Sequence, residues 1–263
     1  MKRLLAAVAW CALAGTPAFA TVAPDGDATQ LRVSNAGEIY RGSIAIRNQG
    51  KSVATVKLYQ TDYAFAADGS NSFGLPGSTP RSNAAWLRLG QEQVVIAPGD
   101  VANVDYEVRV PGDDRLIGTY WSCVMIQEVE GAEATGERRS GVHLHQTIRH
   151  AVQVITEIGE TGRSEVAFRN ARLTTEAGKR LLDVDLENIG DRWLRTDVWL
   201  ELHDATGRAL GRFAAAKRRI FPGTSVRNRI ELTAAPPGKY LALLVADGGR
   251  NDLFGTQIEL DLR

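Results

Sequence analysis

Cysteine is scarce in this sequence, with two residues among 263. Cys11 lies in the N-terminal apolar stretch, so a chain that loses this stretch keeps one thiol and forms no internal disulfide. A single thiol also excludes a metal site made of cysteines alone. Cys123 stands in an apolar run, and we expect it to be a small buried side chain rather than a reactive nucleophile.

A charge bias is absent as well. The 31 basic residues equal the 31 acidic residues in number. Removing residues 1–20 takes away Lys2 and Arg3 and leaves 29 basic against 31 acidic residues. This near-neutral balance gives no electrostatic reason to expect a nucleic acid or an anionic membrane surface as partner.

No stretch after residue 20 approaches the roughly 20 apolar residues that span a bilayer, so no membrane span is expected. The N-terminus has the three parts of a secretory signal peptide, residues 1–20. Lys2 and Arg3 give a positive start, Leu4–Ala14 is apolar, and Ala18–Ala20 has small residues where a signal peptidase cleaves. The residue before Cys11 is too bulky for lipoprotein processing. We therefore expect a periplasmic protein.

The common catalytic motifs are missing: there is no nucleophile elbow, phosphate-binding loop, dinucleotide fingerprint or zinc-protease helix. His143 and His145 are two apart, so both rings would project from one face of a strand, but a metal would need a third ligand. His150 has the opposite parity, and His203 lies in the other half of the chain. We expect no metal, no cofactor and no enzyme activity.

Short segments rich in β-branched and aromatic residues recur along the whole chain, separated by turn residues. In the first half the expected strands are Gln30–Val33, Gly42–Asn48, Ser52–Tyr63, Trp86–Leu89, Val94–Ile96, Val101–Val110, Gly118–Val129 and Val142–Ile158. In the second half they are Ser164–Leu173, Leu181–Asn188, Trp193–His203, Ala209–Phe213, Arg218–Phe221, Ser225–Leu232, Gly238–Val245 and Phe254–Leu262. No helical stretch separates them, which predicts a sandwich or a barrel rather than a parallel sheet.

The two halves share phrases in the same order. Each has an alternating strand ending in Asn-X-Gly, then a Pro-Gly turn, then a Gly-X-Tyr; these are Ser43–Gly50 and Asp183–Gly190, Pro98–Gly99 and Pro222–Gly223, and Gly118–Tyr120 and Gly238–Tyr240. Two rounds of one sandwich plan is the simplest interpretation. We place the boundary near Gly159–Gly162, giving domains of residues 21–160 and 161–263.

Three polar segments stand out between the expected strands. Ala64–Ala84 and Glu130–Ser140 are long loops, for which we expect either mobility or a function. Lys217–Arg219 is a short basic run, which we interpret as a solvated edge that discourages strand pairing.

The first half resembles the N-terminal domain of periplasmic pilus-assembly chaperones, the partners of outer-membrane ushers. The resemblance covers roughly residues 29–158 and rests on an ordered set of phrases: Gly42–Ser43, Arg47–Asn48, Trp86, Ile96–Gly99, Tyr106–Pro111 and Gly118–Ser122. It implies an all-β chain of two consecutive immunoglobulin-like β-sandwich domains after the signal peptide. It also implies that the last strand of the first domain lends alternate apolar side chains to an incomplete subunit.

On that strand, Val142, Leu144 and Ile148 share one parity, with Gln146 interrupting the apolar series. An ordinary half-buried strand has the same pattern, so both interpretations stay open. The resemblance further implies a basic pair in the cleft between the domains that holds the carboxylate of a subunit. Gly37 stands about where the first-strand arginine belongs, which leaves Arg32 and, on the last strand, Arg149 as the candidate anchor.

The leading hypothesis is a chaperone-like assembly factor that binds secreted or pilin-type subunits by β-strand addition, with an outer-membrane usher as a further candidate partner. The alternative is an envelope module that is not a chaperone and binds cell-wall glycan or a surface protein complex.

Overall fold

The structure, a computed structural model, describes residues 21–129, 147–249 and 251–262. The first half forms β1 (Val22–Pro24), β2 (Thr29–Ser34), β3 (Ile39–Asn48), β4 (Ala54–Phe65), β5 (Asn71–Gly74), the 3-10 helix η1 (Ala84–Trp86), β6 (Leu87–Leu89), β7 (Gln93–Ile96), β8 (Val101–Arg109), β9 (Gly118–Val129) and β10 (Arg149–Ile158). The second half forms β11 (Val166–Glu176), β12 (Lys179–Asn188), β13 (Leu194–His203), β14 (Ala209–Ala214), β15 (Arg218–Ile220), β16 (Ser225–Glu231), β17 (Gly238–Asp247) and β18 (Leu253–Leu262). The expected all-β fold class is confirmed. Over these ranges no helix has the length and apolar character needed to cross a membrane.

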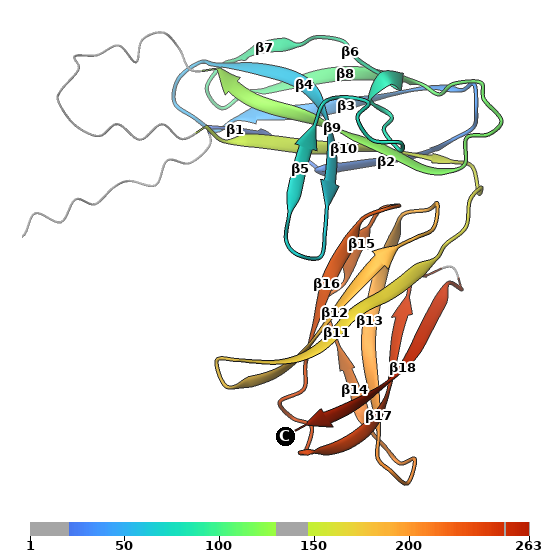
Figure 1. Cartoon of the computed structure of the whole chain (residues 1–263). Helices are drawn as coiled ribbons and strands as arrows, with labels where there is room; N and C mark the ends of the chain where they lie inside the picture. Colours follow the sequence, from blue (N-terminus) through green and yellow to red (C-terminus); the bar gives the residue numbers. More distant parts are fainter. Residues whose placement is uncertain (1–20, 130–146, 250, 263) are drawn as a thin grey trace, which may run out of the picture.

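The first ten strands make one immunoglobulin-like sandwich (Figure 1). One sheet has the order β1-β3-β8-β6, and the other has the order β2-β10-β9-β4-β5, with β7 also paired to β4. Alternate side chains of the two sheets meet in a core that includes Ile46, Val56, Val104 and Val154, all without exposed surface. This alternation is the period of two that the sequence shows, because successive side chains of a strand point to opposite faces.

The last eight strands make the second sandwich, with sheets β11-β12-β16 and β14-β13-β17-β18 and with β15 paired to β13. Its core includes Leu186, Leu200 and Ile230, which are fully buried. At the start of β17 the hydroxyl of Tyr240 donates to the carbonyl of Pro236 at 2.8 Å. A tyrosine bonded back to the chain just upstream at this corner is a feature of the immunoglobulin fold.

The repeated Asn-X-Gly phrase forms the same buried hydrogen-bond arrangement in both sandwiches. Asn48 is fully buried, and its amide donates to the carbonyls of Ser52 at 2.8 Å and Ile96 at 2.9 Å, while its Oδ1 accepts from Gly50 N. Asn188 is equally buried and makes the same three bonds in the second sandwich. Each amide therefore ties the end of one strand to a turn and to a neighbouring strand, which explains why the phrase recurs.

The segment 64–84 is only in part the loop expected from its polar composition. β4 continues to Phe65 and pairs with β5 in a hairpin that extends from the first sandwich toward the second (Figure 1). The ring of Tyr63 stacks on that of Phe73 across the hairpin, with centroids 4.9 Å apart. The turn is closed by Asp68, whose carboxylate accepts from Ser70 N. The strand was missed because Asn71–Gly74 has no apolar alternation, and its cross-strand aromatic contact supplies the missing stabilisation.

Candidate functional site: an open strand edge beside the domain junction

β10 has a different neighbour on each side. Along its whole length, from Arg149 to Ile158, it pairs antiparallel with β9. On the other side it pairs parallel with β2, but only from Gln153 onward. None of the residues that the structure describes pairs with residues 149–152 on this second side, and we call this four-residue segment the open edge.

The backbone groups of Arg149 and Ala151 in the open edge point outward. Gln153 donates its N–H to the carbonyl of Ala28 at 2.9 Å, so the peptide groups of this parity face the β2 side. Ala151 and Arg149 have the same parity, because every second residue of a strand faces the same neighbour. Their N–H and C=O groups therefore offer donors and acceptors to an added strand.

A change of sheet by the N-terminal segment leaves this edge uncovered. β1 belongs to the opposite sheet and pairs with β3, and the chain reaches β10 only at Ala28 and Thr29. The crossing starts at Pro24, which has no N–H to donate, and passes through Gly26 at φ +138°. Arg47 fixes the crossing through an ion pair with Asp25 at 2.7 Å. Between the crossing, β3 and Val152 the structure leaves a hollow of about 390 Å³.

The residues expected to donate a strand lie next to this edge in sequence. Val142, Leu144 and Gln146 fall outside the described residues, and so does the loop Glu130–Ser140. Ile148 is half-buried and immediately precedes β10, which begins at Arg149. The donation of alternate side chains by this segment stays a prediction.

The two arginines of the expected carboxylate anchor lie far apart, Arg149 at the start of β10 and Arg32 on β2 beside the end of β10. Arg149 starts the strand opposite Gln127, and its guanidinium donates to the hydroxyl of Tyr59 at 3.4 Å. Arg32 lies on β2 opposite Thr156. At about 3.3 Å per residue, the seven residues from 149 to 156 place the two positions roughly 23 Å apart along the sheet. The structure thus does not bring this pair together.

The end of β10 leads into a junction where the two sandwiches share an apolar cluster. Trp121, Ile155 and Phe221 are buried there, and Phe65 and Trp193 pack against them. The rings of Trp121 and Phe221 are stacked with centroids 4.8 Å apart. The outer face of the β10–β9 sheet is therefore in direct contact with the turn that follows β15 of the second sandwich.

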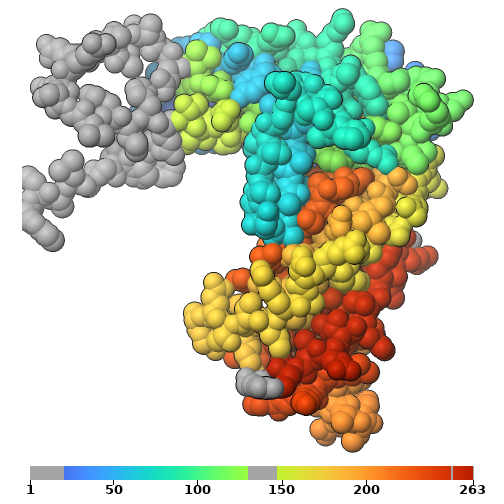
Figure 2. Space-filling model, in the orientation of Figure 1, coloured from blue at the N-terminus to red at the C-terminus, as the bar shows by residue number. Residues whose placement is uncertain are grey.

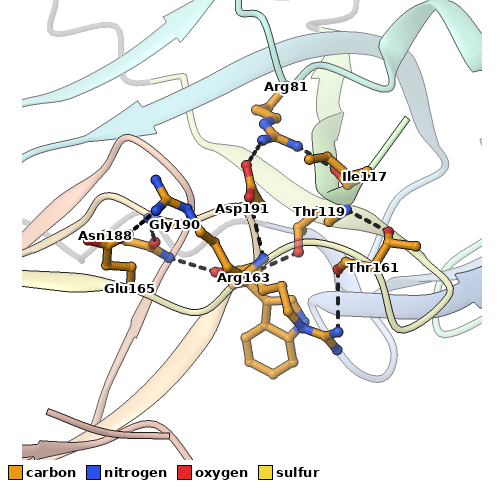
Figure 3. A network of polar contacts seen from close by, with 12 residues as sticks. Arg81, Ile117, Thr119, Thr161, Arg163, Glu165, Asn188, Gly190 and Asp191 are labelled. Atoms are coloured by element: carbon orange, nitrogen blue, oxygen red, sulfur yellow. Dashed lines mark hydrogen bonds and ion pairs between the residues drawn. The ribbon is translucent and has the colours of Figure 1, made fainter. Parts of the chain in front are cut away.

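Asp191 is the centre of the polar part of this junction (Figure 3). Its carbonyl accepts from Thr119 N at 2.8 Å, and its carboxylate forms an ion pair with Arg81 of the first sandwich. Its own N–H donates to the carbonyl of Arg163 at 2.8 Å, and Trp193 N donates to the hydroxyl of Thr119. These bonds connect the loop before β13 to the start of β9 and to the linker between the sandwiches.

Two buried carboxylates support the junction. Glu157 at the end of β10 pairs with Arg192, and their side chains are only 2% and 12% exposed. Asp62 on β4 accepts from Thr79 N at 2.8 Å and from the Ser82 hydroxyl at 2.5 Å, so it holds the loop that carries Arg81. Buried charges of this kind need such partners, because desolvation without them is costly.

Sequence reasoning did not identify the junction, although glycines mark it. Gly118 and Gly162 have φ values of +70° and +78°. A Cβ on Gly118 would lie 2.1 Å from the carbonyl oxygen of Asp191, and one on Gly162 would lie 2.7 Å from the Asp191 Cβ. Only glycine combines this backbone conformation with so close an approach. Gly118 was noted as part of a repeated phrase, but its counterpart Gly238 has no such contact across a junction.

The metal and thiol candidates add no chemistry to this region. His143 and His145 lie outside the described residues, and over the described ranges no three metal-binding side chains come together. Cys123 is buried, as expected. That the chain is not an enzyme stays a prediction.

The burial of Cys123 has a measurable consequence. Desolvation, with a smaller contribution from the Asp62 charge, raises the pKa of this thiol to about 12. At pH 8 about one thiol in ten thousand is then ionised, so a chain beginning at Thr21 should react with iodoacetamide only when it unfolds. We expect no modification of the native protein and one per chain in denaturing urea, as measured by intact mass. Native labelling at the rate of an exposed thiol would contradict this.

No family model matches the sequence, and no curated protein matches it. Solved structures do resemble it, and several of them are fimbrial chaperones. One is "Crystal Structure of Class 5 Fimbriae Chaperone CfaA", with a TM-score of 0.48 and 10% identity over 90% of this chain and 98% of that chain. Another is the chaperone–tip adhesin complex of CFA/I fimbriae, with a TM-score of 0.47 and 9% identity over 87% of this chain and 94% of that chain. A third is the CsuC–CsuE pre-assembly complex of Acinetobacter baumannii, with a TM-score of 0.45 and 11% identity over 91% of this chain and 98% of that chain.

Proposed function

We propose that the protein is a periplasmic chaperone-like assembly factor that binds a secreted or pilin-type subunit by β-strand addition. The observation that carries this proposal is the open edge of β10, where Arg149 and Ala151 present backbone groups to which no described residue bonds. A subunit strand placed there would lie on the same side of β10 as β2. An outer-membrane usher is the partner expected to receive the subunit.

In strand addition, backbone hydrogen bonds give affinity and alternate side chains give selectivity. Each backbone bond to the open edge would contribute about 1 kcal/mol net, so the edge alone gives weak affinity. Selectivity would come from alternate side chains, among them Ile148 and, in the preceding segment, Val142 and Leu144. The 390 Å³ hollow beside Val152 offers room for a side chain of the added strand.

The test is a proline substitution at the open edge. Ala151→Pro removes an N–H that faces away from β9, so the ladder to β9 stays intact, as proline tolerates an edge position. Together with the steric effect of the ring, the lost bond should reduce subunit capture by about tenfold. Capture is measured by co-purifying the tagged mature protein from the periplasm of the source cells and identifying the partner by mass spectrometry.

Ala151→Val is the matched control, because it keeps the N–H and should capture the subunit as the parent does. Amide hydrogen exchange of the purified complex adds a direct readout, with slower exchange expected at Arg149 and Ala151. Equal capture by both variants, or unchanged exchange at these amides, would refute strand addition here. Co-sedimentation of the free protein with peptidoglycan would instead support the glycan-binding alternative.

A further inference from the structure

The basic run Lys217–Arg219 faces the first sandwich. It lies on and just before β15, across a hollow of about 530 Å³ from the β4–β5 hairpin. In Figures 1 and 2 the hairpin reaches down from the first sandwich beside this part of the second. The hairpin supplies Tyr63 and Phe65 to the hollow, and β16 adds Arg227. We call this space the basic hollow.

The side chains that line the basic hollow carry an excess of positive charge. Its lining contains four basic side chains and no carboxylate. Two of the four are neutralised from outside, since Arg227 pairs with Asp185 at 2.7 Å and Lys217 with Asp197 at 3.3 Å. Arg218 has no ion pair with any described residue. The unbalanced charge therefore belongs to Arg218 and Arg219.

Arg219 has a hydrogen-bond donor without an acceptor among the described residues. One of its terminal nitrogens donates to the hydroxyl of Thr29 at 2.9 Å, and its guanidinium lies 5.1 Å from the ring of Trp193. Its Nε is buried and finds no hydrogen-bond partner among the described residues. Burial, and secondarily the charge of Arg195, lowers the pKa of this guanidinium. An anion in the hollow would offset the repulsion between these like charges.

We propose that the basic hollow binds an acidic segment of an extended polypeptide, with carboxylate side chains received by Arg218 and Arg219. Arg218 and Arg219 are adjacent on β15, so their side chains leave the strand in opposite directions, which fits charges spaced along a chain better than a compact ion. The opposite wall is aromatic, with the rings of Tyr63 and Phe65 5.5 Å apart, and gives apolar neighbours of the acidic residues a surface. Only the identification of this polypeptide with the captured subunit rests on the proposed function.

The probe is a short peptide, acetylated and amidated so that it has no terminal charge, in which glutamate alternates with threonine and phenylalanine. Its affinity for the mature protein is measured by titration calorimetry. Arg218→Glu should weaken binding by about tenfold, since reversing a charge at a partly desolvated contact costs on this order. Arg218→Gln should have a smaller effect in the same direction. Arg88→Glu on β6, an exposed arginine outside the hollow, makes the same net change in charge and should bind as the parent does.

Three results would overturn the proposal: equal binding by the Arg218→Glu and Arg88→Glu variants, equal binding of a peptide with glutamine in place of glutamate, or displacement of the peptide by an equal concentration of inorganic phosphate. The last would assign the hollow to compact anions. Circular dichroism of each variant shows that it is folded. The Ala151→Pro variant should bind the peptide normally. A failed peptide titration therefore does not contradict strand addition at the open edge of β10, and a failed subunit-capture experiment does not contradict peptide binding in the basic hollow.

Discussion

Gly118→Ala should destabilise the protein by about 3 kcal/mol or more, because two separate costs add at this position. The residue has φ +70°, which an alanine adopts with strain, and its Cβ would lie 2.1 Å from the carbonyl oxygen of Asp191. The loop before β13 must then move, and the bond from Thr119 N to Asp191 is lost with it. Urea denaturation followed by tryptophan fluorescence measures the change, since Trp121 and Trp193 lie in the junction.

Gly99→Ala separates the two costs. Gly99 has φ +79° in the turn before β8, but a Cβ there would meet nothing within 4 Å. Its substitution should cost about 1 kcal/mol, which is the backbone term alone. Faster proteolysis in the linker, residues 159–165, should accompany Gly118→Ala and not Gly99→Ala. If the two variants lose equal stability, the junction is not a tight contact.

Asn188→Ala should cost about 2–4 kcal/mol and should act on the second sandwich. The amide is fully buried, and its removal leaves the carbonyls of Arg192 and Ile220 without this donor. It also takes one of two acceptors from Gly190 N, which keeps its bond to the carbonyl of Glu165. Asn48→Ala should have an equal effect on the first sandwich, since its three bonds are the same in kind. Scanning calorimetry of the two variants is the measurement.

Asn103→Ala is the control, because Asn103 is an exposed residue of β8 and its loss should stay within about 0.5 kcal/mol. The Asn48 and Asn188 substitutions are in different cores, so their effects should add within about 0.5 kcal/mol. A double variant that loses no more than one single variant would show that the two sandwiches do not depend separately on these amides.

Much of the fold follows from patterns in the sequence because the interactions concerned are local. The alternation of apolar side chains placed the long strands, including β3, β8 and β12, and the shared Asn-X-Gly phrase predicted two rounds of one plan. β5 and the three-residue β1 were missed, since neither has an alternating apolar pattern. The stability of β5 comes from contacts such as the Tyr63–Phe73 stack, which composition does not reveal.

The candidate site was less predictable because it depends on distant pairings. The sequence indicated a strand ending near Ile158, but the open edge exists only because β2 begins opposite Gln153 and leaves Ala151 without a partner strand on that side. The separation of Arg32 from Arg149 likewise depends on the register between β2 and β10. The basic run Lys217–Arg219 could be found in the sequence, whereas the aromatic hairpin opposite it could not.

The parallel pairing of β2 with β10 also sets the order in which the first sandwich can fold. Thr29 pairs with Gln153, which follows it by 124 residues, so this contact forms only after nearly the whole sandwich has been synthesised. Closing so long a loop makes for slow folding, since its entropy is lost before the contact is gained. Until then the core lacks Val152 and Val154, which β10 supplies. The strand that completes the sandwich is therefore the one that carries its open edge, and the nascent chain has no finished edge to offer before its own core is closed.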